Sequence, residues 1–262
     1  MTDPLFSLDG RVVIITGGLG QLGRQFAAAV SAHGARVVLL DQHEGTDADS
    51  DQRFHVRADV TDRGSLERAL AAIESHWEAP HVLINNAALD SPPDAPADTN
   101  GAFEDYPAEV WRRVMDVNVT GVFQCCQVFG GRMAELGRGS VINVASIYGL
   151  VSPDQRIYEY RRQAGDTFFK PAAYSASKSA LLNITRYLAT YWGPRVRVNT
   201  VSFAGVFNNQ DQAFLEAYTA RVPLGRMARE DEYNGAIVFL ASDASSYMTG
   251  GNLVLDGGYT AW

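Results

Sequence analysis

The sequence is poor in cysteine: its only two thiols among 262 residues are the neighbours Cys125 and Cys126. Adjacent cysteines are poorly placed to form an unstrained disulfide with each other. The sequence therefore excludes a disulfide scaffold and a cysteine-rich zinc site. We interpret both cysteines as small apolar residues of a helix, and this sparse usage fits a reducing, cytoplasmic setting.

Positive charge is also in deficit. Lys and Arg number 22 against 30 Asp and Glu, a formal net charge of −8, which disfavours a nucleic-acid-binding protein because that function needs a basic stripe. No apolar run approaches the ~18 residues of a membrane span, and Met1–Pro4 lacks the basic start of a signal peptide. The five histidines show no ligand spacing, so we expect no metal site.

Short apolar runs alternate with segments of helical period. The runs are continuous rather than alternating, which is typical of strands covered on both faces, so we predict a doubly wound parallel sheet. The fold class is α/β with three α/β/α layers, in a single domain over 1–262. The expected strands are Val12–Ile15, Arg36–Leu40, Phe54–Arg57, Val82–Ile84, Val141–Val144, Val196–Val201 and Leu253–Leu255. The expected helices are Leu22–His33, Leu66–Trp77 with Asp62 as its cap, Ala108–Leu136, Ala172–Trp192 and Glu230–Ala241.

A glycine-rich turn follows the first expected strand and opens the first helix. The GxGxxG pattern is met by Gly18, Gly20 and Gly23. Glycines at this position let the backbone turn sharply and approach a pyrophosphate, which then rests on the helix N-terminus. The pattern alone is weak, but its place between strand and helix predicts a dinucleotide site of Rossmann type.

Asp41 closes the second expected strand, 18 residues after Gly23. A carboxylate there can accept both hydroxyls of the adenosine ribose and repels a 2′-phosphate. The position favours NAD over NADP as cofactor.

Four further patterns carry chemistry. Tyr174 and Lys178 lie one helical turn apart, in Tyr-Ser-Ala-Ser-Lys. Ser146 ends the strand before them, Asn118 lies among apolar residues of the long helix, and Asn85–Ala88 ends an earlier strand. Together these residues resemble the short-chain dehydrogenase/reductase family over nearly the whole chain.

The resemblance implies a catalytic tetrad of Asn118, Ser146, Tyr174 and Lys178. A tyrosine with a pKa near 10 is a poor base at pH 7, and the nearby positive charge of Lys178 would favour its phenolate. Ser146 would hydrogen-bond the substrate oxygen, and Asn118 would hold a water that links Lys178 to solvent. The implied cofactor-binding residues are Gly17, Gly20, Gln21, Leu22, Gly23, Asp41, Asp59, Val60, Asn86, Ala87, Tyr174, Lys178, Val206 and Asn208.

The chain departs from the family pattern at several positions. Gln21 occupies a position that is usually glycine, so that Gly17, Gly20 and Gly23 fit the spacing of the longer, sugar-nucleotide-acting branch. After the sixth strand, Phe203 and Ala204 replace the usual Pro-Gly, and Asn208 replaces a threonine. The geometry of this loop is therefore left open.

The largest departure is the long stretch between Ser146 and Tyr174, which we interpret as a lid-like insertion at about 152–170. Its four cations, Arg156, Arg161, Arg162 and Lys170, predict an anionic substrate, such as a phosphorylated or nucleotide-linked sugar, with the three arginines as the candidate substrate-binding residues. The alternative is a solvated loop whose cations pair with the acidic residues Asp154, Glu159 and Asp166. The insertion, Phe203, Asn208–Asp211 and Tyr259–Trp262 also resemble oxidoreductases encoded with bacterial surface-glycan and flagellin-sugar pathways.

Three functions remain open. The first is an NAD(H)-dependent enzyme that interconverts a secondary alcohol and a ketone on a polar, sugar-like substrate. The second is a 3-oxoacyl-(acyl-carrier-protein) reductase, which usually takes NADPH and is disfavoured by Asp41. The third is a non-catalytic dinucleotide-binding protein.

The resemblance also implies a homotetramer, with a dimer as the alternative. The long helices Ala108–Leu136 and Ala172–Trp192 would pair across one interface, and the segment Leu253–Trp262, with two aromatics expected to be exposed, would form another.

Overall fold

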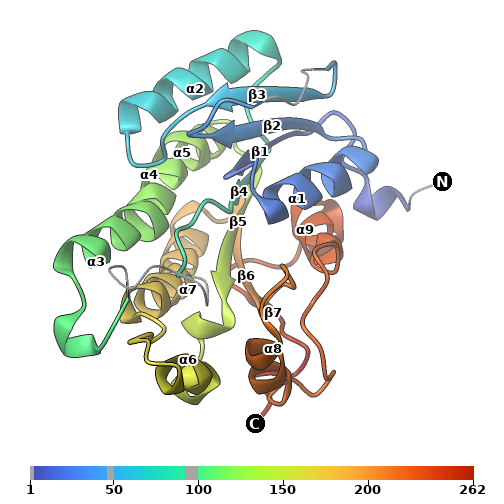
Figure 1. Ribbon diagram of the computed structural model, residues 1–262. Helices are drawn as coiled ribbons and strands as arrows, with labels where there is room; N and C mark the ends of the chain where they lie inside the picture. Colours follow the sequence, from blue (N-terminus) through green and yellow to red (C-terminus); the bar gives the residue numbers. More distant parts are fainter. Residues whose placement is uncertain (1–2, 46–49, 92–99) are drawn as a thin grey trace.

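The computed structural model describes residues 3–45, 50–91 and 100–262. Its centre is one seven-stranded sheet in the order β3-β2-β1-β4-β5-β6-β7, with every neighbouring pair parallel (Figure 1). The doubly wound α/β fold predicted from the apolar runs is confirmed. The strands are β1 (Val12–Thr16), β2 (Arg36–Asp41), β3 (Arg53–Arg57), β4 (Val82–Asn85), β5 (Gly139–Ser146), β6 (Val196–Phe203) and β7 (Asn252–Leu255).

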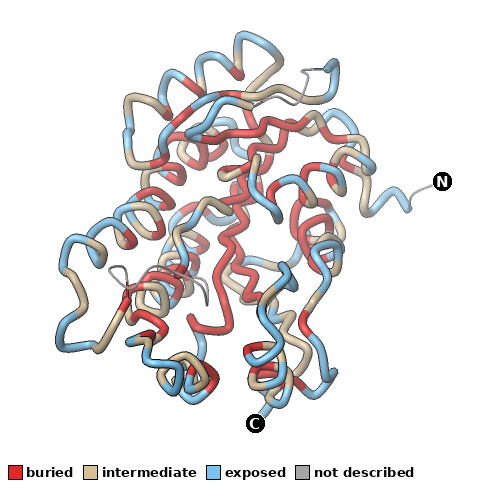
Figure 2. The backbone as a smooth tube through the Cα atoms, viewed as in Figure 1, coloured by how far each residue is buried: buried red, intermediate tan, exposed pale blue. Residues whose placement is uncertain are grey.

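Both faces of the sheet are buried, which explains why the strands read as continuous apolar runs. On β1, Val12 and Ile14 belong to one hydrophobic cluster, while Val13 and Ile15 belong to a second cluster on the opposite face. The buried strands form the centre of the molecule in Figure 2.

Helices cover the two faces. α1 and α9 pack on one side, and α2, α4, α5 and α7 pack on the other (Figure 1). The helices are α1 (Gln21–Ala32), α2 (Arg63–His76), α3 (Ala108–Met115), α4 (Val122–Cys125), α5 (Gly131–Glu135), α6 (Glu159–Gln163), α7 (Ala172–Trp192), α8 (Gln212–Thr219) and α9 (Asn234–Ala241).

Local signals set the ends of several helices. The side chain of Asp62 accepts a hydrogen bond from Gly64 N at 2.9 Å, so this residue caps α2 as predicted. Gly34 follows α1 with a φ of +95°, a conformation that favours glycine.

The long helix expected over 108–136 is present, but it is not purely α-helical. Two π-helical segments, Asp116–Gly121 and Cys126–Gly130, alternate with α3, α4 and α5. A π turn closes one residue later than an α turn and shifts the direction of the side chains that follow. Asn118 lies in the first π segment and is buried.

Two helix predictions need correction. The helix expected to begin at Glu230 begins at Asn234, and residues 230–233 form a turn in which Glu232 pairs with Arg226 and Arg229. α8 was not predicted, although Asp211 caps it by accepting a hydrogen bond from Phe214 N at 2.8 Å.

A third hydrophobic cluster lies beyond the carboxyl ends of β5 and β6. It joins the insertion, through Ile157, Tyr158 and Phe168, to α8 and to the chain end. Tyr259 belongs to this cluster and is buried, so the expectation of two exposed aromatics at the chain end is wrong for Tyr259 and holds for Trp262.

Candidate active site

A cavity of about 980 Å³ lies along the carboxyl ends of β1, β2 and β4. Parallel sheets of this topology bind their ligands at that edge. Nine of the fourteen residues predicted to bind a cofactor line the cavity: Gly17, Gly20, Gln21, Leu22, Asp41, Asp59, Val60, Asn86 and Ala87.

The glycine turn is tightly packed, which explains two of its glycines. Gly17 has a φ of +62°, and a Cβ there would lie 2.9 Å from Ala87 Cα. Gly23 does not line the cavity. A Cβ on Gly23 would lie 2.3 Å from the carbonyl oxygen of Gly17, so this glycine lets the first turn of α1 lie against the loop.

The ends of β1 and β4 are tied together beside the turn. The hydroxyl of Thr16 accepts hydrogen bonds from the backbone N–H groups of Asn86 and Ala87, both at 3.0 Å. The side chain of Asn86 donates to the carbonyl oxygens of Thr16 and Gly17. These bonds fix the floor of the cavity.

Asp41 presents its carboxylate at the cavity wall. One oxygen accepts from Leu19 N at 3.2 Å and the other from His43 N at 3.1 Å. The carboxylate is therefore held in place from the glycine turn and from its own loop, at the strand end where a ribose binds in this topology.

Gln21, which stands where the family usually has glycine, has a structural role. Its side chain donates to the carbonyl oxygen of Phe207 and to Glu230, both at 3.3 Å. It thereby joins the glycine turn to the loop after β6, which carries Val206 and Asn208. Neither Val206 nor Asn208 lines the cavity.

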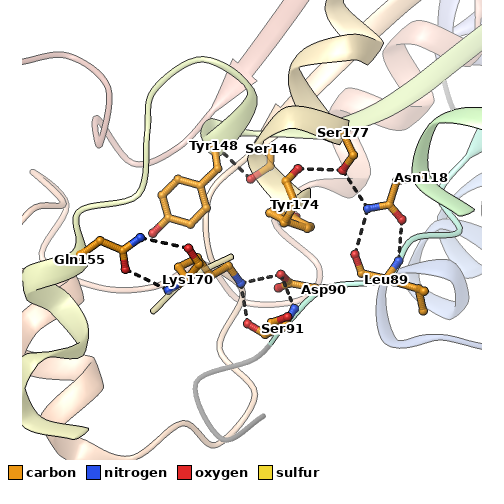
Figure 3. Close-up of polar contacts among 10 residues, drawn as sticks. All are labelled: Leu89, Asp90, Ser91, Asn118, Ser146, Tyr148, Gln155, Lys170, Tyr174 and Ser177. Atoms are coloured by element: carbon orange, nitrogen blue, oxygen red, sulfur yellow. Dashed lines mark hydrogen bonds and ion pairs between the residues drawn. The ribbon is translucent and has the colours of Figure 1, made fainter. Parts of the chain in front are cut away.

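Three of the four predicted catalytic side chains, Asn118, Ser146 and Tyr174, lie together in Figure 3. Ser146 ends β5, and its hydroxyl accepts a hydrogen bond from Tyr148 N at 3.2 Å. Tyr174 and Lys178 lie on α7, with the ammonium of Lys178 5.8 Å from the centre of the Tyr174 ring. Lys178 donates to the carbonyl oxygen of Val144 at 2.7 Å.

Burial controls the titration of both groups. It raises the pKa of Tyr174, the negative charge of Asp90 adds to the rise, and a hydrogen bond with Ser146 offsets part of it. Burial lowers the pKa of Lys178 to about 8, and Asp90 opposes that shift. Lys178 is therefore mostly protonated at pH 7.

The family model described as "Enoyl-(Acyl carrier protein) reductase" matches residues 20–260. D-Threitol dehydrogenase of Mycolicibacterium smegmatis is 34% identical, over 97% of this chain and 95% of that protein. The chain belongs to the short-chain dehydrogenase/reductase family.

Solved structures agree with this assignment. A short chain dehydrogenase from Leptospira borgpetersenii with bound NAD+ has a TM-score of 0.87 and 32% identity, covering 99% of this chain and 96% of that one. A gluconate 5-dehydrogenase from Burkholderia cenocepacia, in complex with NADP and tartrate, has a TM-score of 0.85 and 26% identity, covering 99% and 98%. Members of this family are oxidoreductases that act on CH–OH groups and bind a nicotinamide dinucleotide.

Asn118, the fourth residue of the predicted tetrad, connects the cavity to α7. Its side chain accepts from Leu89 N at 2.7 Å and donates to Leu89 O at 2.9 Å and to the Ser177 hydroxyl at 3.0 Å. Leu89 lines the cavity, and Ser177 donates to the carbonyl oxygen of Tyr174. The position of Asn118 thus ties the cavity wall to the helix that carries Tyr174.

The insertion arginines form ion pairs within their own segment. Arg156 pairs with Asp154 at 2.9 Å, Arg162 with Glu159 at 2.6 Å, and Arg161 with Asp166. These are the pairs that the solvated-loop alternative predicts. Arg162 also donates to the carbonyl oxygens of Gln155 and Phe168, which holds the segment in shape.

Sequence reasoning missed one pair at this site. Lys170, the last residue of the insertion, is buried and donates to Asp90 at 2.5 Å, and its ammonium lies 4.9 Å from the centre of the Tyr174 ring. The available signal was a lysine four residues before Tyr174, because lysine is rare in this chain.

Among residues 3–45, 50–91 and 100–262, no group of three or more His, Cys, Asp or Glu side chains is arranged to hold a metal ion. Within the same residues, the helices lack the combination of length and apolar character that crossing a membrane requires. The Pro-rich stretch Ser91–Pro96 follows the fourth strand in the sequence, and from residue 92 onward it lies outside the described residues.

Proposed function

We propose that the protein is an NAD(H)-dependent oxidoreductase that interconverts a secondary alcohol and a ketone on a polar, sugar-like substrate. The observation that carries the proposal is the grouping of Tyr174, Ser146 and Lys178, which hydrogen bonds through Asn118 connect to a cavity lined by Asp41. Such a grouping pairs a proton acceptor with a cofactor site, as dehydrogenation requires.

Each side chain has a distinct role in this proposal. The bound nicotinamide supplies the acceptor for hydride. Tyr174 takes the proton of the substrate hydroxyl, and Ser146 donates a hydrogen bond to the substrate oxygen. Lys178 holds a positive charge beside the phenol, because its pKa of about 8 keeps it protonated at neutral pH.

The preference for NAD over NADP rests on Asp41. A 2′-phosphate at this strand end would meet the carboxylate, which already accepts bonds from Leu19 and His43 and has little freedom to move away. The described side chains that line the cavity near Asp41 also include His43 and Gln42.

The proposed substrate is polyhydroxylated. D-Threitol dehydrogenase, a relative at 34% identity, is named for a polyol. The further proposal that Arg156, Arg161 and Arg162 bind an anionic group requires these side chains to leave their acidic partners. A neutral polyol requires no such exchange.

One panel of assays separates the candidate functions. Oxidation of threitol, galactitol and related polyols with NAD+ would support the proposal. Reduction of an acetoacetyl thioester with NADPH would support a 3-oxoacyl-(acyl-carrier-protein) reductase instead. Dinucleotide binding without turnover on any substrate would contradict both.

We also propose a cytoplasmic homotetramer. Phe123 on α4 and the stacked pair Tyr187 and Tyr191 on α7 are exposed, as expected if these helices pair with another copy. Trp262 is exposed at the second expected interface. Val114 and Val128 lie on the same long helix as Phe123 but are buried within the chain, so they are not available to a second copy. Light scattering at micromolar concentration tests the assembly, and a monomer would contradict it.

A further inference from the structure

The chain contains only two lysines, and both lie against Tyr174. Lys178 is the lysine of the predicted tetrad, and Lys170 comes from the insertion. Their ammonium groups lie 5.8 and 4.9 Å from the centre of the Tyr174 ring. All twenty other cationic side chains of the protein are arginines.

Lys170 is held in place by four hydrogen bonds. Its ammonium donates to an oxygen of Asp90 at 2.5 Å and to the carbonyl oxygen of Ser91 at 2.7 Å. Its backbone N–H donates to the side chain of Gln155 at 2.9 Å, and its carbonyl oxygen accepts from the same side chain at 3.0 Å (Figure 3). The Lys170 side chain is 5% exposed, so its charge requires a partner.

Asp90 opposes the chemistry proposed for Tyr174. A phenolate is negative, and a carboxylate close by makes it harder to form, so that Asp90 raises the pKa of Tyr174. Asp90 belongs to the loop after β4, which also lines the cavity. Without a cation, this carboxylate would push the deprotonation of Tyr174 to higher pH.

Every element packed around Tyr174 contributes to this balance. Asp90 comes from the loop after β4 and Ser146 from β5. Lys170 and Tyr158 come from the insertion, Lys178 from α7, and Tyr218 from α8. Ser146 and the other tyrosines are uncharged at neutral pH, so the charges that face Tyr174 from the described part of the chain are Asp90 and the two lysines.

We propose that Lys170 is a positioning residue that neutralises Asp90 beside Tyr174 and thereby sets the pH range over which Tyr174 accepts a proton. The proposal rests on the function proposed for Tyr174. In this proposal the insertion takes part in the reaction without touching the substrate, because its last residue, Lys170, supplies the positive charge that neutralises Asp90.

The test compares Lys170→Met, Asp90→Asn and the double variant in alcohol oxidation. Lys170→Met leaves Asp90 without its cation, so the acid limb of the kcat/KM profile should move to higher pH by about one unit. Asp90→Asn leaves Lys170 without its anion, and the limb should move to lower pH by about one unit. The double variant should return close to the wild-type profile, and Lys170→Arg should keep it.

The control is Arg68→Met, which removes one positive charge from an exposed side chain on α2. It should leave the pH profile in place, because the Arg68 side chain is 75% exposed and its charge is screened by solvent and salt. Asp90 is half-exposed, so Asp90→Asn is expected to fold even where Lys170→Met does not.

Two results would overturn the proposal. If Lys170→Met and Asp90→Asn both lower activity without shifting the acid limb of the kcat/KM profile in opposite directions, the ion pair between Lys170 and Asp90 only stabilises the loop after β4. If Lys170→Met raises KM and leaves the limb unchanged, Lys170 binds substrate directly.

A second measurement needs no turnover. Tyrosinate absorbance is titrated with oxidised cofactor bound, and the same titration of Tyr174→Phe is subtracted. The difference should show the same opposite shifts for Lys170→Met and Asp90→Asn. If no alcohol is oxidised, the proposed function fails, while this titration still decides whether Lys170 and Asp90 control Tyr174; unchanged titrations would refute the proposal.

Discussion

The cavity and the aromatic cluster of the insertion, α8 and the chain end are built in different ways. In the proposed function, the cavity is the dinucleotide end of the active-site cleft and the cluster borders its substrate end. The dinucleotide end relies on the backbone: Gly17 and Gly23 pack where a Cβ would collide with neighbouring main chain. The substrate end relies on side chains from the insertion, α8 and the chain end, which meet in one aromatic cluster. The first end depends on close main-chain approach, whereas the second depends on contacts between segments distant in sequence.

This difference separates two kinds of specificity. A backbone cradle accepts any ligand with the right phosphate geometry, so discrimination there falls to a single side chain such as Asp41. The substrate end can change with its insertion while the sheet and the cavity stay the same. Binding of cofactor and choice of substrate should therefore respond to different substitutions.

Tyr174→Phe should produce the largest effect, because it removes the proton acceptor at the junction of the two ends. We expect kcat to fall about 10²- to 10⁴-fold, with fold and NADH affinity retained. Lys178→Ala should damage both turnover and cofactor binding. Steady-state kinetics and NADH titration measure the two effects, with Tyr247→Phe, a fully exposed tyrosine, as the control. If Tyr174→Phe keeps more than about a tenth of kcat, Tyr174 is not the base.

Phe168→Ala should weaken the substrate end alone. Phe168 is fully buried, packs against Tyr158 at 4.9 Å between ring centres, and lies beneath the guanidinium of Arg161. Truncating a buried phenylalanine costs about 3–5 kcal/mol, which urea unfolding measures.

NADH affinity of the folded Phe168→Ala variant should stay near wild type, because its contacts lie at the other end of the cleft. Phe103→Ala is the control, since Phe103 is 76% exposed and should change stability by less than about 0.5 kcal/mol. If Phe168→Ala and Phe103→Ala lowered the free energy of unfolding equally, the aromatic cluster would not be what holds the insertion in place.

The same contrast explains what the sequence could predict. The sheet, α1, α2 and α7 follow from local patterns, and the cavity residues Gly17 to Leu22 and Asp41 belong to short motifs. The π segments around Asn118 have no simple sequence period, and the pairing of Lys170 with Asp90 joins residues 80 positions apart. Such contacts follow from the packed fold rather than from spacing.

Asp41→Asn should sharpen the comparison at the dinucleotide end. Wild type should bind NADH at least tenfold more tightly than NADPH, about 1.4 kcal/mol, because the carboxylate repels a 2′-phosphate. The variant should lose most of that preference, as measured by tryptophan fluorescence. Asp59→Asn carries the same charge change in the same cavity and should affect both cofactors alike. If the wild type bound NADPH as tightly as NADH, there would be no basis for an NAD preference.

Arg156→Ala should have the smallest effect. The Arg156 side chain is 81% exposed and pairs with Asp154, which also pairs with Arg221. An exposed ion pair contributes about 0–1 kcal/mol, so KM for a neutral polyol should change less than about fivefold. A phosphorylated sugar tests the opposite outcome. If Arg156 leaves Asp154 to bind the phosphate, the substitution should raise KM about 10- to 150-fold for that substrate alone. Added salt should reduce that loss, because the contact is exposed. If the variant has the same KM as the wild type for each of the two substrates, Arg156 is a structural residue of the insertion and does not bind substrate.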